Sequence, residues 1–254
     1  MLIQNALCTS LTALAIPILR GRDFVMSARK NSMKSLQIAT NIIKQAKLLG
    51  VSLAGIVSLA SLRSSPSYKV TNTKMPDAKS FLILALAHNE DEPQLDWWGF
   101  DRGTKGNQRL HEISEKLIHR LKEYSIVSQC LAYSPENGGI YLKDAAALAG
   151  LGIIGKNNLL ITKEYGPRIR LSAVSIEKEL PSTPKIEFDP CNICDMVCRK
   201  VCPQNAFING IYSNSLCNVQ MKRDESVFSN YTEKQQNPYK CIKYCRACEL
   251  ACPI

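Results

Sequence analysis

Apolar residues recur with helical spacing after Met33, which predicts a first helix from there to Leu49. Gly50 follows the last apolar position, where a helix often ends. The run over 51–58 is short, apolar and β-branched, and the run over 80–87 is longer and almost wholly apolar. Such runs are typical of strands buried on both faces, so we expect both to be central strands.

Predicted helices and strands continue to alternate along the chain up to about residue 180. An amphipathic helix is predicted over 107–124 and a strand over 126–132. An alanine-rich helix follows over 141–150, and a further strand is expected over 168–174. The segment 181–190 is rich in proline at its ends, and we expect it to be a linker.

Residues 1–32 fit this pattern poorly. They contain an apolar stretch broken by Pro17 and then several basic residues, with no basic segment in front of the apolar part. A secretion signal is therefore not indicated. We expect residues 1–32 to be an extension outside the fold, with the compact domain beginning near Met33.

Nine of the eleven cysteines lie in the last 64 residues. They form two windows of thirteen residues, and each window holds four cysteines and ends in Cys-Pro, with the ninth cysteine between them. The first window contains Cys191, Cys194, Cys198 and Cys202, the second contains Cys241, Cys245, Cys248 and Cys252, and Cys217 stands between.

This spacing is close to the one with which bacterial-type ferredoxins hold cubane iron–sulfur clusters, the fourth cysteine of each run reaching the other cluster. Each window has one residue more than the usual pattern, and a bulge can absorb it while the sulfurs converge. A disulfide framework suits small secreted domains, and paired zinc sites would not explain two Cys-Pro endings. The sequence therefore predicts two [4Fe–4S] clusters. They need eight thiolates where the tail offers nine, and spacing alone would leave out Cys241.

Composition limits the cellular setting. With 45% hydrophobic and 21% charged residues the chain is ordinary for a globular protein, and no apolar run approaches the ~20 residues that span a bilayer. Oxygen-sensitive clusters and unpaired thiols indicate a reducing, cytoplasmic setting without a membrane. The formal net charge is +10, but clusters would lower it and the basic residues are scattered among acidic ones. Contact with tRNA is therefore not favoured.

Two stretches carry candidate ligand-binding groups. A glycine-and-amide loop follows the alanine-rich helix, where glycines let a ligand approach the backbone and the polar side chains offer hydrogen-bond donors. Adjacent tryptophans, which cannot both face one core in a strand, lie in the irregular segment after residue 88. One of them is a candidate for lining a cavity, and packing of both in a loop is the alternative. The residues concerned are Gly152, Gly155, Lys156, Asn157 and Asn158 in the loop, with Trp97 and Trp98.

The loop segment Ala149-Gly-Leu-Gly-Ile-Ile-Gly-Lys-Asn-Asn, the earlier Ala46-Lys-Leu-Leu-Gly-Val-Ser and the two Cys-Pro motifs resemble the epoxyqueuosine reductases and the related reductive dehalogenases. The resemblance covers about 33–254. It implies an α/β fold: a nitroreductase-like cobalamin-binding domain, with a mixed sheet flanked by helices, over 33–185, and a ferredoxin-like double-cluster domain over 186–254. It also implies a corrinoid that lies against the glycine-and-amide loop near one cluster.

The resemblance also implies a ligand set, because the family places a lone cysteine between the motifs and follows it with Cys-x2-Cys-x3-Cys-Pro. The first cluster would then use Cys191, Cys194, Cys198 and Cys252, and the second Cys202, Cys217, Cys245 and Cys248. Cys241 would be the spare thiol.

Two departures from the family bear on the substrate. The family's catalytic Asp precedes the alanine-rich helix, but here Asn137 stands near that place with Glu136 beside it. We expect Glu136, Tyr133 or Tyr141 to supply the proton instead, with burial raising the pKa of a carboxyl group there. The helical-repeat extension that many of those enzymes use for tRNA also has no counterpart in this sequence.

The favoured interpretation is a cobalamin-dependent iron–sulfur oxidoreductase that passes electrons from the clusters to a corrinoid and then to an organic substrate. Its partners would be an electron donor such as ferredoxin or flavodoxin and a small-molecule or modified-nucleoside substrate. The alternative is a ferredoxin-type electron-transfer protein without corrinoid or substrate. Neither the substrate nor the oligomeric state follows from the residues.

Overall fold

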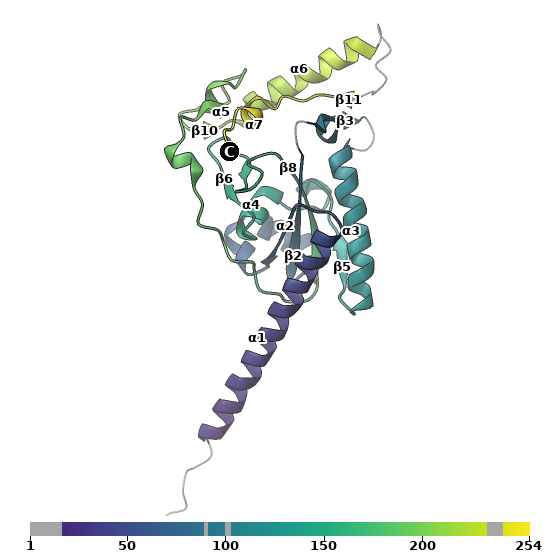
Figure 1. Ribbon diagram of the computed structural model, residues 1–254, viewed down its shortest axis with the longest axis vertical. Helices are drawn as coiled ribbons and strands as arrows, with labels where there is room; N and C mark the ends of the chain where they lie inside the picture. The colour runs from purple at the N-terminus through teal and green to yellow at the C-terminus, as the bar shows by residue number, and fades with distance from the viewer. Residues whose placement is uncertain (1–16, 89–90, 100–102, 233–240) are drawn as a thin grey trace, which may run out of the picture.

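The computed structural model of the chain describes residues 17–88, 91–99, 103–232 and 241–254 (Figure 1). Its centre is a four-stranded sheet with the strand order β1-β2-β8-β5. The strands are β1 (Leu53–Ser58), β2 (Ser80–Ala87), β8 (Ile169–Ile176) and β5 (Ser128–Cys130).

All three pairings in this sheet are antiparallel, so the implied mixed sheet is wrong for the described residues. The direction of a strand depends on where a long connection returns the chain, and local sequence patterns do not encode that return. The sheet is covered on both faces, as its apolar strands predicted. Along β2 the side chains alternate between two separate buried clusters. Leu82, Leu84 and Leu86 face one cluster, and Phe81, Ile83 and Ala85 face the other.

Helices α1 (Pro17–Leu48) and α3 (Lys105–Glu123) cover one face of the sheet. Helix α4 (Leu142–Leu148) and the short 3-10 helix η1 (Ser61–Ser64) pack on the other, next to α2 (Ser67–Lys74). The result is a three-layered α/β body (Figure 1).

Helix α1 begins at Pro17, not at Met33 as the apolar spacing predicted, and it crosses the expected domain boundary without a break. Its N-terminal part projects from the body (Figure 1). The side chains described from 29 to 38 are exposed or half-buried, and Ala39 is the first buried residue. The apolar pattern therefore marks where the helix starts to pack. Residues 1–16 of the expected extension lie outside the described residues.

Strand β1 was expected to be central, but its only strand partner in the described sheet is β2. Its other edge is covered by the segment after β8. The Thr183 N–H donates to the Ile56 carbonyl at 2.8 Å, and the Ser58 N–H donates to the Ser182 hydroxyl at 2.9 Å. The expected linker therefore covers a sheet edge that would otherwise be open.

The remaining elements are short except for α6, and several of them carry the cysteines. In chain order they are η2 (Pro93–Asp96), β3 (Trp98–Gly99), β4 (Gly103–Thr104), η3 (Pro135–Asn137), β6 (Ile153–Ile154), β7 (Leu160–Ile161), η4 (Pro190–Ile193), α5 (Val197–Lys200), β9 (Phe207–Ile208), β10 (Ile211–Tyr212), α6 (Asn214–Thr232), β11 (Cys241–Ile242) and α7 (Ala247–Leu250).

Strand β11 pairs with β3, and β3 pairs with β4. The cysteine-rich end of the chain is therefore joined through a small sheet to a segment that lies far earlier in the sequence. Among the helices described, none is long and apolar enough to cross a membrane.

Candidate functional site

Two sets of four cysteines gather at the end of the body where α5, α6 and α7 lie. The first cysteine set shares a small pocket between η4, α5 and the end of the chain. Burial raises the pKa of the Cys198 thiol, and the charges of the neighbouring thiolates raise it further. The four residues of the first cysteine set are Cys191, Cys194, Cys198 and Cys252.

The second cysteine set shows the same mutual effect. Burial raises the pKa of the Cys248 thiol to about 12, with further contributions from the other three thiolates. Four thiolates this close repel one another unless a cationic core lies between them. The structure thus brings together the two groups that the family resemblance implied. The second cysteine set comprises Cys202, Cys217, Cys245 and Cys248.

Cys241 has different surroundings. It is buried in β11, opposite Gly99 of β3. Burial raises the pKa of its thiol, and Lys243 and Lys105 lower it, with no cysteine among the groups that act on it. Its position separates it from both sets.

Backbone N–H groups point at several sulfurs of the two sets. The Lys156 N–H lies 3.5 Å from the Cys191 sulfur, and the Ala206 N–H lies 3.3 Å from the Cys202 sulfur. The Asp224 carboxylate accepts a hydrogen bond from the Cys245 N–H at 2.8 Å, which fixes that turn. Hydrogen bonds to sulfur stabilise thiolates and tune the potential of a bound cluster.

The glycine-and-amide loop lies against the cysteines. Besides the Lys156 contact with the first set, the buried Asn157 side chain donates to the Cys248 carbonyl in the second set at 3.3 Å. The Asn158 carbonyl accepts a hydrogen bond from the Lys143 ammonium at 2.6 Å. The polar groups of this loop therefore connect the two cysteine sets.

The two glycines of this loop are required by packing. A Cβ atom on Gly152 would lie 2.2 Å from the Ile161 carbonyl oxygen, and one on Gly155 would lie 2.6 Å from the Ile161 side chain. Strands β6 and β7 pair at this point. Close approach of the chain to itself explains these glycines without a ligand.

A cavity of about 440 Å³ opens between the sheet and the cysteine-rich end. We call it the first cavity. Trp98, Tyr133 and Tyr141, three of the expected site residues, line it together with Cys245 of the second cysteine set. Trp97 is not among its lining residues, and Lys243 lies over the Trp97 ring at 4.1 Å.

Glu136 lies on η3 at the rim of this region and is fully exposed. Hydrogen bonds from its own backbone and from Ser134 lower the pKa of its carboxyl group, with Lys74 adding to the effect. The expected raised pKa is therefore wrong, because no apolar wall covers this turn. A carboxyl group of this kind is ionised at neutral pH.

A second cavity of about 740 Å³ lies beside the first and shares Trp98, Tyr133 and Leu171 with it. The Trp98 and Tyr133 rings meet edge to face, with their centroids 6.0 Å apart, and the Tyr244 ring meets Trp98 in the same way. Aromatic rings thus lie where the two cavities meet.

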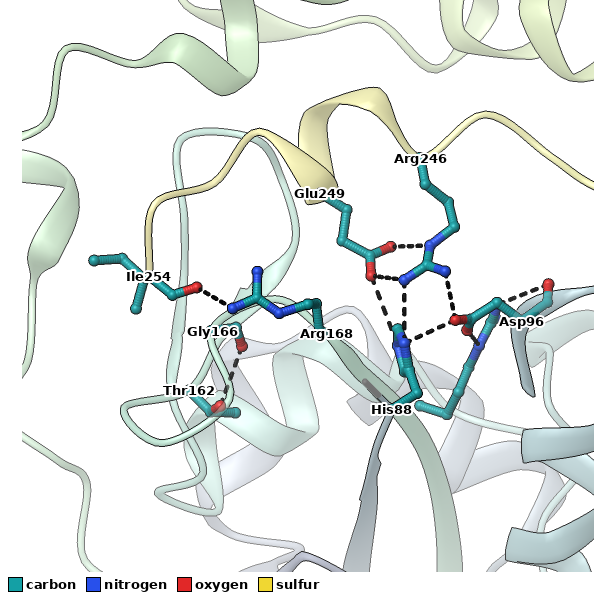
Figure 2. Close-up of polar contacts among 9 residues, drawn as sticks. His88, Asp96, Thr162, Gly166, Arg168, Arg246, Glu249 and Ile254 are labelled. Carbon is teal, nitrogen blue, oxygen red and sulfur yellow. Dashed lines mark hydrogen bonds and ion pairs between the residues drawn. The ribbon is translucent and has the colours of Figure 1, made fainter. Parts of the chain in front are cut away.

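A buried polar network beside the first cavity escaped the sequence analysis. His88 follows β2, and its Nδ1 lies 2.7 Å from the Asp96 carboxylate. Arg246 lies 2.6 Å from the same carboxylate and also pairs with Glu249 (Figure 2). Arg170 binds the other Asp96 oxygen at 2.6 Å. A lone histidine after an apolar strand was the only signal, and it did not indicate which charges would surround it.

This network keeps the buried Asp96 carboxylate charged. Burial alone would raise the pKa of Asp96, but the hydrogen bond from His88 and the charges of Arg170 and Arg246 hold it below its usual value. Asp96 is therefore ionised at neutral pH. Its partners come from β8 and from the segment leading into α7, so the network joins the sheet to the cysteine-rich end.

The last residue is also tied to the body. The Arg168 guanidinium donates to the Ile254 carbonyl at 2.8 Å, next to the Thr162–Gly166 bridge (Figure 2). A Cβ atom on Gly166 would lie 2.0 Å from that carbonyl oxygen, and its φ of +56° also favours glycine. This contact holds the end of the chain near Cys252.

The chain is similar in sequence to known proteins. An epoxyqueuosine reductase of Lactococcus garvieae is 25% identical over 189 residues, which is 70% of this chain and 52% of the relative. One from Bacillus cereus is 26% identical over 203 residues, 73% of this chain and 51% of the relative. The chain resembles epoxyqueuosine reductases. It spans about half the length of the curated relatives it matches, and no family model matches it.

Solved epoxyqueuosine reductases have a similar fold. An epoxyqueuosine reductase crystallised with an epoxyqueuosine-modified tRNA-Tyr stem loop superposes with a TM-score of 0.63 at 20% identity, over 86% of this chain and 65% of that one. A catabolic reductive dehalogenase is more distant, with a TM-score of 0.48. The mixed α/β fold of epoxyqueuosine reductases is therefore the fold of this chain.

Proposed function

We propose that the chain is an iron–sulfur oxidoreductase resembling epoxyqueuosine reductase, with a [4Fe–4S] cluster on each cysteine set. The observation that carries the proposal is the separation of eight cysteines into two groups of four, with Cys241 outside both. The division into a body over 33–185 and a double-cluster domain over 186–254 belongs to this proposal.

The spacing of the sulfurs supports cubanes over zinc. Four sulfurs about 2.3 Å from one zinc ion would lie roughly 3.8 Å apart. Within the described part of the chain, no three cysteine sulfurs all lie within 4.8 Å of one another. A cubane holds its thiolates farther apart, because four irons lie between them.

The position of the second cysteine set supports electron delivery into the first cavity. Cys245 belongs to that set and lines the cavity. The first cysteine set does not line this cavity. It lies across the glycine-and-amide loop from the second set, and the η4 residue Ile193 beside it is 94% exposed. We infer that a donor such as ferredoxin or flavodoxin delivers electrons at the first set and that they leave through the second.

The two cavities fit a corrinoid by size and lining. Drug-sized ligands occupy about 300–1,000 Å³, and a corrinoid is larger, so it would need both the 440 and the 740 Å³ cavities. Trp98 and Tyr133 would offer flat faces to the macrocycle, and Lys143 a donor to its edge. When bound, the corrinoid would supply the reductive chemistry at its cobalt.

The chain's own residues would bind the substrate and hold a proton. Tyr133 and Tyr141 both line the first cavity, whereas Glu136 does not line it and is ionised. We therefore assign the proton to Tyr133 or Tyr141 in place of the family's Asp. The solved relative with a tRNA stem loop makes a modified nucleoside the favoured substrate class.

Anaerobic reconstitution tests the whole proposal against the electron-carrier alternative. The full chain is loaded with iron and sulfide, incubated with cobalamin and passed through gel filtration. We expect about eight irons per chain and a corrinoid spectrum in the protein peak. Trp98→Ala should lower the retained cobalamin, and Trp97→Ala, outside both cavities, is the matched control. Full iron content without retained cobalamin would favour the electron carrier.

A further inference from the structure

Three side chains that could bind a metal ion lie close together, away from the cysteine-rich end. His111 and Glu115 are one turn apart on α3, so both side chains are on the same face of the helix. Cys130 is the last residue of β5, which packs beside α3. The imidazole, carboxylate and thiol ligand atoms all lie within 4.8 Å of one another.

We propose that His111, Glu115 and Cys130 form a zinc site with an open fourth position. An imidazole, a carboxylate and a thiolate are the three ligand types that zinc prefers, and sites with three protein ligands are typical of catalytic rather than structural zinc. Both ligands on α3 are exposed, so small side-chain rotations can bring the donors to bonding distance.

The second cavity provides the space for the fourth ligand. His111 and Cys130 both line this cavity of about 740 Å³. A water molecule, or an anionic oxygen of a molecule bound there, would complete the tetrahedron. The site would thus add a Lewis acid at the cavity end that is far from Cys245.

Cys130 and Glu115 already interact in the structure. Burial, followed by a hydrogen bond and the charge of Glu115, raises the pKa of Cys130 to about 12. A divalent cation between the two would replace repulsion with attraction. The inference concerns residues outside both cysteine sets and does not depend on the corrinoid.

The test uses the full chain with its clusters already reconstituted, because empty cluster cysteines would also take up zinc. The protein is incubated with zinc chloride, desalted and assayed for zinc and iron. We expect about one zinc per chain in the wild type and a loss of nearly all of it in His111→Ala and Cys130→Ser. His119→Ala, at an exposed histidine two turns along the same helix, is the matched control.

Zinc K-edge absorption identifies the ligands. We expect one sulfur at about 2.3 Å with nitrogen and oxygen neighbours at about 2.0–2.2 Å. Four sulfur neighbours would place the zinc in the cysteine sets and overturn the proposal. Equal zinc content in the wild type and His111→Ala would overturn it as well and leave only a hydrogen bond between Cys130 and Glu115. His111 is exposed, so that variant should fold normally, and unchanged iron content verifies this.

Discussion

Cys217 lies between the two cysteine windows and Cys241 opens the second window, and their surroundings assign them different roles. Cys217 is on α6 and acts electrostatically on Cys245 and Cys248, whereas Cys241 is buried in β11 beside two lysines. Cys217→Ser should therefore lower the iron content from about eight to about four per chain, since one cubane loses a ligand.

Cys241→Ser is the matched control for that substitution and should keep about eight irons per chain. Iron analysis and the electron paramagnetic resonance of the reduced protein measure both variants. If Cys241→Ser loses four irons while Cys217→Ser loses none, the ligand sets are reversed at this position.

The first cavity separates the candidate proton donors in a way that position in the chain does not. Glu136, Tyr133 and Tyr141 all precede α4, where the family keeps its acid. Only the two tyrosines line the first cavity, because η3 turns Glu136 toward solvent. The sequence pointed to this segment but could not decide which of its side chains line the cavity.

Helix α1 shows how an element can be longer than the pattern that predicts it. Apolar spacing after Met33 predicted the part that packs on the sheet, and this part was found, but the helix begins at Pro17. Backbone hydrogen bonds continue a helix without tertiary contacts, so periodicity marks only the buried stretch.

A chain that begins at Met33 should fold with the same iron content and nearly the same melting temperature. The reason is that the first buried α1 side chain described is Ala39. Thermal unfolding and iron analysis measure the effect. A chain that begins at Thr40 is the control and should melt at a lower temperature, since it lacks Ala39 and the N-terminal turn that supports Ile42. A large loss from the Met33 chain would show that residues 1–32 are part of the fold.

The whole molecule is held together by contacts between segments far apart in the chain. Strand β11 pairs with β3, Arg168 binds Ile254, and Asp96 receives Arg170 from β8 and Arg246 from the segment before α7. Asp96 is at the centre of these contacts, with a side chain that is 1% exposed.

Asp96→Asn should destabilise the protein by roughly 3 kcal/mol, because two arginines would lose a buried counter-charge. The folded-state pKa of Asp96 is below its usual value of 3.8, so its contribution is present above that pH and is lost as the pH falls through the folded pKa. Urea unfolding at pH 7 measures the loss. Asp77→Asn, at an exposed aspartate, is the control and should change stability little. An equal effect of both substitutions would contradict the role of the network.

The sequence by itself determined the local elements and predicted the cluster chemistry. Strand β2 matched its predicted run over 80–87, and α3 and α4 lie within a few residues of their predicted spans, because burial on one or both faces leaves a periodic pattern. The Cys-Pro windows predicted clusters because thiolate spacing is a local property.

Only the tertiary structure decided the features that form where segments far apart in the chain come into contact. These features are the antiparallel sheet and the cover over the edge of β1. The tertiary structure also decided which charges surround His88 and Asp96, and it brought Cys130 close to His111. Each depends on which residues meet after long connections close, and periodicity carries no record of such meetings.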